Sequence, residues 1–254
     1  MWIDAHNHLQ APLLAETLPI LTSLPMEAAV VNGTTEADWP HVQELAAEYP
    51  WIRPAFGLHP WFLARRTANW KKALDQFLST PQSSLGEIGL DLWMKDPDRA
   101  AQEEIFRWQL TLAAERNIPA TIHCLKAFGL LTKILRTNPL PACGFLLHAW
   151  SGSIEIAREC LDMGAYFSFS GHFLHERKAA RREVFRQLPL ERLLVETDAP
   201  SMNLPDHLAK ATLESGANHP ANIVACYEHL ARIRGMEVAD LALAVRNNFH
   251  RLFQ

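Results

Sequence analysis

The 254-residue chain lacks the features that mark several classes of protein. Its four cysteines include no C-x-x-C pair, so we expect reduced thiols and a cytoplasmic protein. No apolar run approaches the ~20 residues that a membrane span needs, and no signal-peptide pattern is visible, so we expect no contact with membranes. The net charge of −4 gives no general positive field, so a nucleic-acid substrate would need a local basic patch or capture by metal.

The sequence also contains no linker, low-complexity tract or internal repeat, and we expect one domain over residues 1–254. Short apolar runs rich in β-branched residues alternate with longer helical patterns, which predicts an α/β protein with a parallel sheet. The eight predicted strands cover residues 2–5, 28–32, 53–57, 84–90, 120–123, 144–148, 166–170 and 193–197.

Eight strand–helix units in a chain of this length favour a (β/α)₈ TIM barrel, whose typical size is about 250 residues. Helical periodicity is clearest over residues 102–116, around Ile154, Ala157 and Leu161, and over residues 238–252. A doubly wound open sheet is the alternative. No Gly-x-Gly-x-x-Gly follows the first strand, which argues against a dinucleotide-binding version of that sheet.

Residue types that bind metals recur at one place in these units, since they lie within or directly after five of the predicted strands. Catalytic groups of a TIM barrel gather at the carboxyl ends of its strands, so the barrel would bring these side chains together. The six residues are His6, His8, Glu87, His123, His148 and Asp198.

Each residue type suits a metal site. His6 and His8 are two apart on an extended segment, so both rings point to the same side, and neutral imidazoles are common metal ligands. Glu87 can bridge two cations through its two oxygens, and the glycines beside it allow close approach of backbone or substrate. Asp198 could bind a metal and accept a proton from bound water.

Each signal is weak by itself. A single histidine near a strand end is more often a polar residue with a satisfied hydrogen bond than a ligand, and Glu87 could be a buried ion-pair partner. Six such residues at matching strand ends change this assessment, because buried charges are costly unless they are paired or bound to metal. We therefore predict a site for two divalent cations.

The motifs along the chain resemble those of the TatD-type deoxyribonuclease family of metal-dependent hydrolases. The most specific are GEIGLD at Gly86–Asp91 and LLVETDAP at Leu193–Pro200. The others follow in family order and span essentially the whole chain: DAHNH (Asp4–His8), GLHP (Gly57–Pro60), IPATIHC (Ile118–Cys124), LHAWSGS (Leu147–Ser153), FSFSG (Phe167–Gly171) and the closing NNFHRLF.

The resemblance implies a TIM barrel that hydrolyses phosphodiester bonds, with DNA 3′ ends as the expected substrate. It assigns the two metals to ligand sets that share Glu87, with His6, His8 and Asp198 completing one set and His123 and His148 the other. Histidine ligands favour Zn, Mn, Co or Ni, whereas Mg, which related enzymes use, prefers oxygen ligands.

The chain departs from the family pattern at positions that would contact phosphate or substrate. HCLKA stands where H-C-R-E-A is common, so Lys126 would supply the positive charge. Ala149 and Trp150 stand in HAWSG where H-C-F-S-G is usual. The predicted metal ligands are all retained.

Four residues are candidates for substrate contacts: His59, Lys126, Trp150 and His172. His59 could contact substrate or relay a proton, or else hold its loop by a hydrogen bond. Trp150 could stack on a base or pack the loop, and Lys126 could contact phosphate or be solvated. His172 could reach the site from the seventh strand. Asp91 is expected to orient a ligating histidine.

We predict a metal-dependent phosphodiesterase or deoxyribonuclease that acts on the single-stranded ends of DNA or on a small phosphoester. Metal-activated water would carry out hydrolysis, with Asp198 and Glu87 as the catalytic residues. The alternative is a hydrolase of small amides, lactones or phosphotriesters, because the same metal site polarises a carbonyl. A non-catalytic metal-binding protein is the third hypothesis. We expect a monomer.

Overall fold

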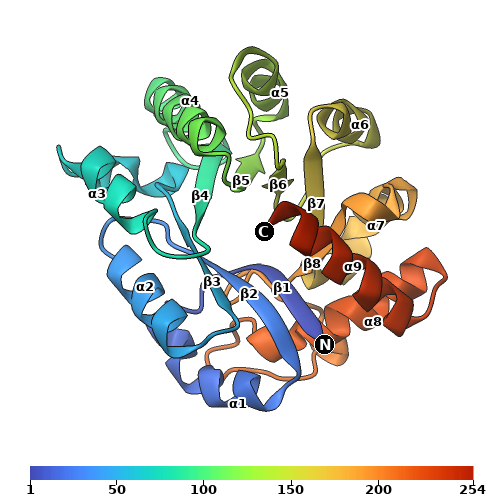
Figure 1. The fold of residues 1–254 in the computed structure, drawn as a ribbon. Helices are drawn as coiled ribbons and strands as arrows, with labels where there is room; N and C mark the ends of the chain where they lie inside the picture. Colours follow the sequence, from blue (N-terminus) through green and yellow to red (C-terminus); the bar gives the residue numbers. More distant parts are fainter. Residues whose placement is uncertain (254) are drawn as a thin grey trace.

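A computed structural model describes residues 1–253, and eight parallel strands form its centre (Figure 1). The strands follow one another around the sheet in sequence order, and each pairs in parallel with the next. They are β1 (Trp2–Asn7), β2 (Met26–Asn32), β3 (Ile52–Phe56), β4 (Ser84–Asp91), β5 (Ala120–Leu125), β6 (Phe145–Leu147), β7 (Ala165–Ser170) and β8 (Leu193–Glu196).

Helices alternate with these strands and form an outer layer around them (Figure 1). They are α1 (Leu18–Ser23), α2 (Trp39–Glu48), α3 (Trp70–Phe77), α4 (Arg99–Arg116), α5 (Phe128–Thr137), α6 (Ile154–Asp162), α7 (Ala179–Gln187), α8 (Ile223–Arg234) and α9 (Val238–Leu252). Within residues 1–253, no helix combines the length and apolarity needed to cross a membrane.

The ring of strands closes between β1 and β8, and two backbone hydrogen bonds join them at the carboxyl end. The N–H of Asp198 donates to the carbonyl of His6 (2.9 Å), and the N–H of His8 donates to the carbonyl of Ala199 (2.8 Å). The fold is therefore the predicted TIM barrel. The doubly wound alternative is wrong, because the first and last strands of this sheet meet.

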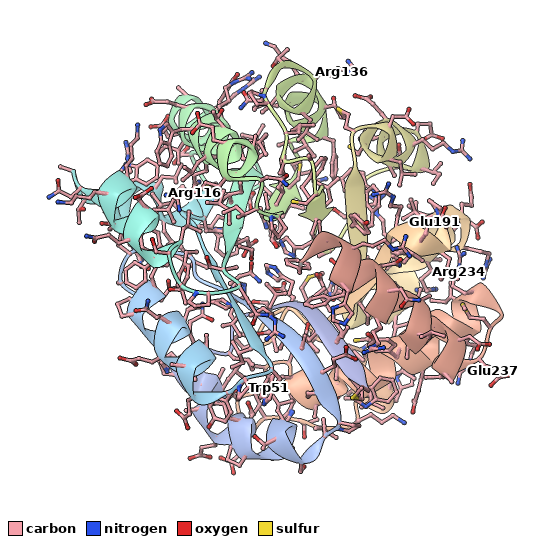
Figure 2. All side chains as sticks on the ribbon, in the orientation of Figure 1. Trp51, Arg116, Arg136, Glu191, Arg234 and Glu237 are labelled. Atoms are coloured by element: carbon pink, nitrogen blue, oxygen red, sulfur yellow. The ribbon has the colours of Figure 1, made fainter. Side chains whose placement is uncertain are left out.

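The strands are buried on both faces, as their continuous apolar runs predict. Every residue of β4 is buried, including Glu87. Side chains fill the interior of the ring and the space between strands and helices, whereas charged residues such as Arg136 and Glu237 lie on the outer rim (Figure 2). The core thus has two parts, one inside the barrel and one beneath the helices.

Helix α9 covers the amino end of the barrel, opposite the end where the predicted site residues lie. The Asn248 side chain donates hydrogen bonds of 2.8 Å to the carbonyls of Leu190 and Leu193, where β8 begins. Arg246 pairs with Glu27 near the start of β2 at 2.7 Å. This end is closed by packing and polar contacts, which leaves the carboxyl end for chemistry.

All eight predicted strands are present, and their ends differ from the predicted ones by at most two residues. The differences move three histidines relative to their strands. His148, predicted to end the sixth strand, follows β6, because β6 ends at Leu147. His6, predicted to follow the first strand, lies inside β1, because β1 continues to Asn7. His123, predicted to end the fifth strand, lies inside β5, which continues to Leu125.

Gly89 allows β4 and β5 to lie close together beside the site. Its φ of +139° is disfavoured for side-chain-bearing residues, and a Cβ there would lie 2.0 Å from the carbonyl oxygen of His123. The backbone of β5 therefore occupies the space that any larger residue would need. Glu87 and His123 face each other across this close strand pair.

We predict that Gly89→Ala lowers the free energy of unfolding by more than ~2 kcal/mol, because the new methyl group meets backbone that cannot move away alone. Gly129→Ala is the matched control, since a Cβ there has no heavy atom within 4 Å. Because Gly129 lies in helix α5, Gly129→Ala should change the free energy of unfolding by no more than about 1 kcal/mol. Urea denaturation measures both variants, and equal midpoints would contradict this account of β4.

Candidate metal centre

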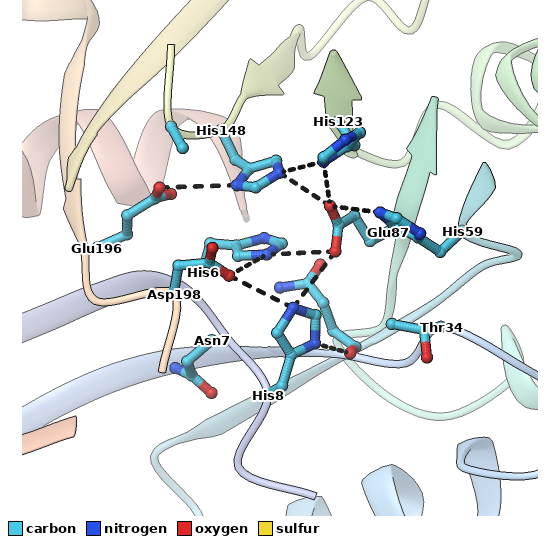
Figure 3. Close-up of polar contacts among 12 residues, drawn as sticks. His6, Asn7, His8, Thr34, His59, Glu87, His123, His148, Glu196 and Asp198 are labelled. Carbon is cyan, nitrogen blue, oxygen red and sulfur yellow. Dashed lines mark hydrogen bonds and ion pairs between the residues drawn. The ribbon is translucent and has the colours of Figure 1, made fainter. Parts of the chain in front are cut away.

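Glu87 lies at the centre of a group of histidines at the carboxyl end of the barrel (Figure 3). Its Oε1 lies 2.8 Å from Nε2 of His148 and 3.0 Å from Nδ1 of His123. Its Oε2 lies 3.3 Å from Nε2 of His8 and 3.5 Å from Nε2 of His6. The two carboxylate oxygens therefore face two different pairs of histidines.

Asp198 completes the group on the side of β1. Its Oδ1 lies 3.4 Å from Nε2 of both His6 and His8, the pair that also faces Oε2 of Glu87. The rings of His6 and His148 stack with their centroids 3.9 Å apart, which joins the two halves. All six residues predicted from the sequence thus lie together, and we call them the histidine–carboxylate cluster.

The chain turns sharply at three strand ends around this cluster. Lys126 after β5, Ala149 after β6 and Asp198 after β8 have φ values of 57°, 41° and 53°. The left-handed backbone conformation is uncommon for residues other than glycine, and residues that adopt it are frequent at functional sites. The turn before Asp198 is held by Asp4, whose carboxylate accepts the Thr197 N–H at 3.0 Å and its hydroxyl at 2.6 Å.

The histidines and carboxylates of the cluster strongly affect one another's protonation. Burial alone would raise the pKa of Glu87, but the neighbouring histidines outweigh it and hold that pKa well below its ordinary value. Burial alone would lower the pKa of His8, but the carboxylates of Asp198 and Glu87 outweigh it and raise that pKa to about 10. The cluster is built around negative charge that positive charge must balance.

Two histidines, when neutral as metal ligands must be, present a lone pair to the cluster because their other ring nitrogen is engaged. Nδ1 of His8 donates to the carbonyl of Asn32 at 2.8 Å, so in the neutral ring Nε2 carries the lone pair. Nε2 of His123 donates to Oδ2 of Asp91 at 3.1 Å, which leaves the lone pair on Nδ1. Asp91 thus orients His123, which is the role predicted for it.

His6 and His148 have nitrogen atoms that the protein leaves unsatisfied. His6 is fully buried, and neither of its ring nitrogens has a hydrogen-bond partner among residues 1–253. Nδ1 of His148 lies 3.6 Å from Oε1 of Glu196, too far for a good hydrogen bond. Leaving such atoms buried and unpaired costs roughly 1–3 kcal/mol each, whereas a bound cation would satisfy the nitrogens that face the carboxylates.

The donor atoms of the cluster fit a divalent cation. Groups of three imidazole nitrogens and carboxylate oxygens lie within 4.8 Å of one another, and two such groups are His6, His8, Glu87 and His6, His148, Asp198. Borderline-soft cations prefer this mixture of nitrogen and oxygen ligands.

His59 also lies close to Glu87, but its ring differs from those of the cluster histidines in which nitrogen carries the proton. Its Nε2 lies 3.3 Å from Oε1 of Glu87, so its position suggests a ligand. Its Nδ1, however, accepts the backbone N–H of Trp61 at 3.1 Å, which puts the proton of the neutral ring on Nε2. Burial lowers the pKa of His59 to about 4 and keeps it neutral. His59 therefore donates a hydrogen bond to Glu87 and offers no lone pair there.

The remaining predicted substrate contacts lie outside the cluster. Lys126 is exposed at the end of β5. His172 is partly buried, and its Nδ1 lies 3.3 Å from the carbonyl oxygen of Asn203. The stacking role predicted for Trp150 is wrong in this structure, because its side chain is only 2% exposed and packs against Phe128 and Phe167.

Two residues near the cluster were not predicted from the sequence. Glu196 is buried on β8, faces His148 and accepts a hydrogen bond from the Ser168 hydroxyl. Its charge inside an apolar strand was a signal for such a role. Trp61 is half-exposed at a pocket of about 300 Å³ beside Glu87. Nothing in its local sequence indicated that position.

The comparisons with known proteins agree with this fold and indicate a family. The family model described as TatD related DNase matches residues 3–254. A protein of Bacillus subtilis named uncharacterized metal-dependent hydrolase YabD is 32% identical over 100% of this chain and 99% of its own length. A protein of Citrobacter rodentium named 3′-5′ ssDNA/RNA exonuclease TatD is 32% identical over 88% of this chain and 85% of its own.

A solved structure agrees as well. The crystal structure of YjjV, a TatD homologue from Escherichia coli K12, superposes with a TM-score of 0.91 at 28% identity, covering 99% of this chain and 97% of that one. The family model, the relatives and this superposition all cover most or all of the chain, so the resemblance seen in the motifs is confirmed. The chain belongs to the TatD related DNase family of metal-dependent hydrolases.

Proposed function

We propose that this protein is a nuclease that removes nucleotides from the 3′ ends of single-stranded DNA, with two divalent cations held by the histidine–carboxylate cluster. The observation that carries the proposal is that the two carboxylate oxygens of Glu87 face separate pairs of histidines. A carboxylate placed this way suits two cations, and paired cations recur in nucleases. The exonuclease name of the Citrobacter rodentium relative supports the same reaction.

The ligand sets follow from the faces of Glu87. One cation would be held by Oε2 together with His6, His8 and Asp198, and the other by Oε1 together with His123 and His148. When bound, divalent cations supply Lewis acidity, which lowers the pKa of water and neutralises charge on a phosphoryl group.

The protein's own groups then have separate tasks. Burial alone would raise the pKa of Asp198, but the nearby His6 and His8 outweigh it and hold that pKa below its ordinary value, so this carboxylate stays in the ionised form that a general base requires. Asp91 and Asn32 hold the rings of His123 and His8 in the orientation that faces Glu87. These contacts keep the reacting groups in place before substrate arrives.

Basic residues that could contact a DNA backbone follow β5 and β7 along the chain: Lys126 comes directly after β5, and Arg177, Lys178 and Arg181 come after β7. Burial first, and then the positive charges of Arg177, Arg181 and Lys126, lower the pKa of Lys178. Lys126 forms no salt bridge within the part of the chain that the structure describes. A local patch of this kind is what a chain of net charge −4 needs to attract a polyanion.

A hydrolase of small amides, lactones or phosphotriesters is the second candidate, favoured by the pocket beside Glu87. The pocket has a volume of about 300 Å³, at the lower end of small-molecule sites. Phe62, Pro12 and Pro200 add apolar surface to it. The monomeric state and the cytoplasmic location stay predictions.

The test of the proposed function uses metal-free protein and a 5′-labelled single-stranded oligonucleotide, with each divalent ion added separately. A ladder of products that shortens from the 3′ end is the expected result. A panel of esters, lactones, amides and phosphotriesters is assayed beside it. Turnover of a panel member without any cleavage of DNA would overturn the nuclease proposal in favour of the second candidate.

Metal content tests the assignment of ligands. Glu87→Ala should lose most bound metal, because Glu87 contributes to both ligand sets. His123→Gln should lose the metal on its side, whereas His59→Gln should keep the wild-type content, since the His59 nitrogen that faces Glu87 carries a proton. Elemental analysis after dialysis measures all three variants. Equal losses in the two glutamine variants would make His59 a ligand.

We predict that Asp198→Asn lowers kcat by at least ~10²–10⁴-fold, because an amide cannot accept the proton of water. The fold should survive, since the change lies at the catalytic end of the barrel. Asp162→Asn, at the exposed end of α6, is the control and should leave kcat unchanged. A thermal melt with saturating metal verifies folding. Activity of Asp198→Asn within threefold of wild type would exclude it as the base.

Lys126→Ala should weaken the salt dependence of DNA cleavage. Loss of one phosphate contact reduces the slope of log kcat/KM against log salt by about 0.7 for a single strand. Lys133→Ala is the matched control, because Lys133 is an exposed lysine on α5 and should leave the slope unchanged. The same slope in the Lys126 variant and wild type would remove Lys126 from the substrate path.

A further inference from the structure

Trp61 presents an aromatic surface directly beside the cluster. It lies in the short helix Pro60–Arg65 after β3, and its side chain is 51% exposed. It lines the pocket of about 300 Å³ that also contains Glu87 and His59. An exposed aromatic ring beside a site for nucleic acid offers a face on which a base can stack.

The Trp61 ring is held in one orientation despite this exposure. Its Nε1–H donates to Oδ2 of Asp91 at 2.7 Å, and its ring lies edge-on to His59 with centroids 5.1 Å apart. Oδ1 of the same carboxylate accepts the backbone N–H groups of Trp93 at 2.8 Å and Met94 at 3.2 Å. A surface already fixed in this way loses little conformational entropy when a ligand stacks on it.

Asp91 also links Trp61 to the cluster. Its Oδ2 accepts the Trp61 indole N–H and lies 3.1 Å from Nε2 of His123, whose other nitrogen faces Glu87. The position of the indole and the orientation of His123 therefore depend on one carboxylate oxygen. A ligand that stacks on Trp61 is positioned relative to the reacting groups by contacts that reach back to the cluster.

We propose that Trp61 stacks on the nucleobase of the 3′-terminal nucleotide and thereby positions the scissile phosphate over the cluster. This rests on the proposed nuclease function and adds to it that the enzyme recognises the base of the departing nucleotide as well as the phosphate. A pocket of about 300 Å³ suits one nucleoside, and one terminal nucleoside with its phosphate is what an exonuclease removes in each step. Stacking on an aromatic ring tolerates every base, because every base has a π-face.

The test compares two 5′-labelled oligonucleotides that differ only at the 3′-terminal nucleoside, which is normal in one and abasic in the other. Wild type should cleave the normal end with a KM at least about fivefold lower, the lower end of measured stacking contributions. Trp61→Ala should raise KM for the normal end to that of the abasic end and change KM for the abasic end less than twofold.

Two further variants separate stacking from structural support. Trp61→Phe keeps an aromatic ring but loses the N–H that Asp91 accepts, and it should retain most of the preference for the normal end. Trp93→Ala is the control, because Trp93 is an exposed tryptophan (70%) outside the pocket lining, and it should leave the preference unchanged. Quenching of tryptophan fluorescence by each oligonucleotide in the Asp198→Asn variant gives a readout without turnover.

The outcomes distinguish this proposal from the proposed function. Cleavage of both ends by wild type with equal KM would overturn stacking while the nuclease function stands. Equal losses on both ends in Trp61→Ala would also overturn it, and would assign Trp61 to the support of Asp91 and His123 alone. Absence of any DNA cleavage by wild type would remove the proposed function and the stacking proposal together.

Discussion

The site depends on one buried charge, the carboxylate of Glu87 inside a strand whose every residue is buried. A carboxylate is expensive to remove from water unless opposite charge or hydrogen-bond donors surround it. Here histidines from β1, β5 and the segments after β1, β3 and β6 all face its two oxygens. The barrel makes this convergence possible, because the carboxyl ends of neighbouring strands meet at one place.

Hydrogen bonds behind the histidines decide what each ring can do. A carbonyl accepts from His8 and a carboxylate accepts from His123, so each ring in its neutral form presents a lone pair to the cluster. A backbone N–H donates to His59 instead, so that ring presents a proton. Rings with similar distances to Glu87 therefore fall into two chemical kinds, and distance alone does not separate a ligand from a hydrogen-bond donor.

The sequence predicted the fold and the members of the cluster because both depend on local patterns. Continuous apolar runs such as GFLLH identify buried parallel strands, and the polar residues at their ends then converge by the geometry of the barrel. Within that frame the strand ends were accurate enough to put His6 and Glu87 in the same place. The family resemblance added the expected reaction and substrate class, which stay proposals.

Contacts between distant loops could not be predicted in the same way. Trp150 lies only two residues after His148, yet its ring turns into the core against Phe128 and Phe167. Trp61 has an equally plain local sequence, yet its ring faces the pocket because Asp91, 30 residues later, accepts its indole N–H. The direction of a loop side chain depends on which partners the rest of the fold brings to it, and the local sequence does not contain them.

The most direct test of the account is a crystal structure of the protein grown with Mn²⁺, with anomalous scattering used to locate the metal. The account predicts two anomalous peaks that share Glu87, one bound by His6, His8 and Asp198 and the other by His123 and His148, with His59 hydrogen-bonded and bound to neither. A single peak, or a peak coordinated by Nε2 of His59, would contradict it.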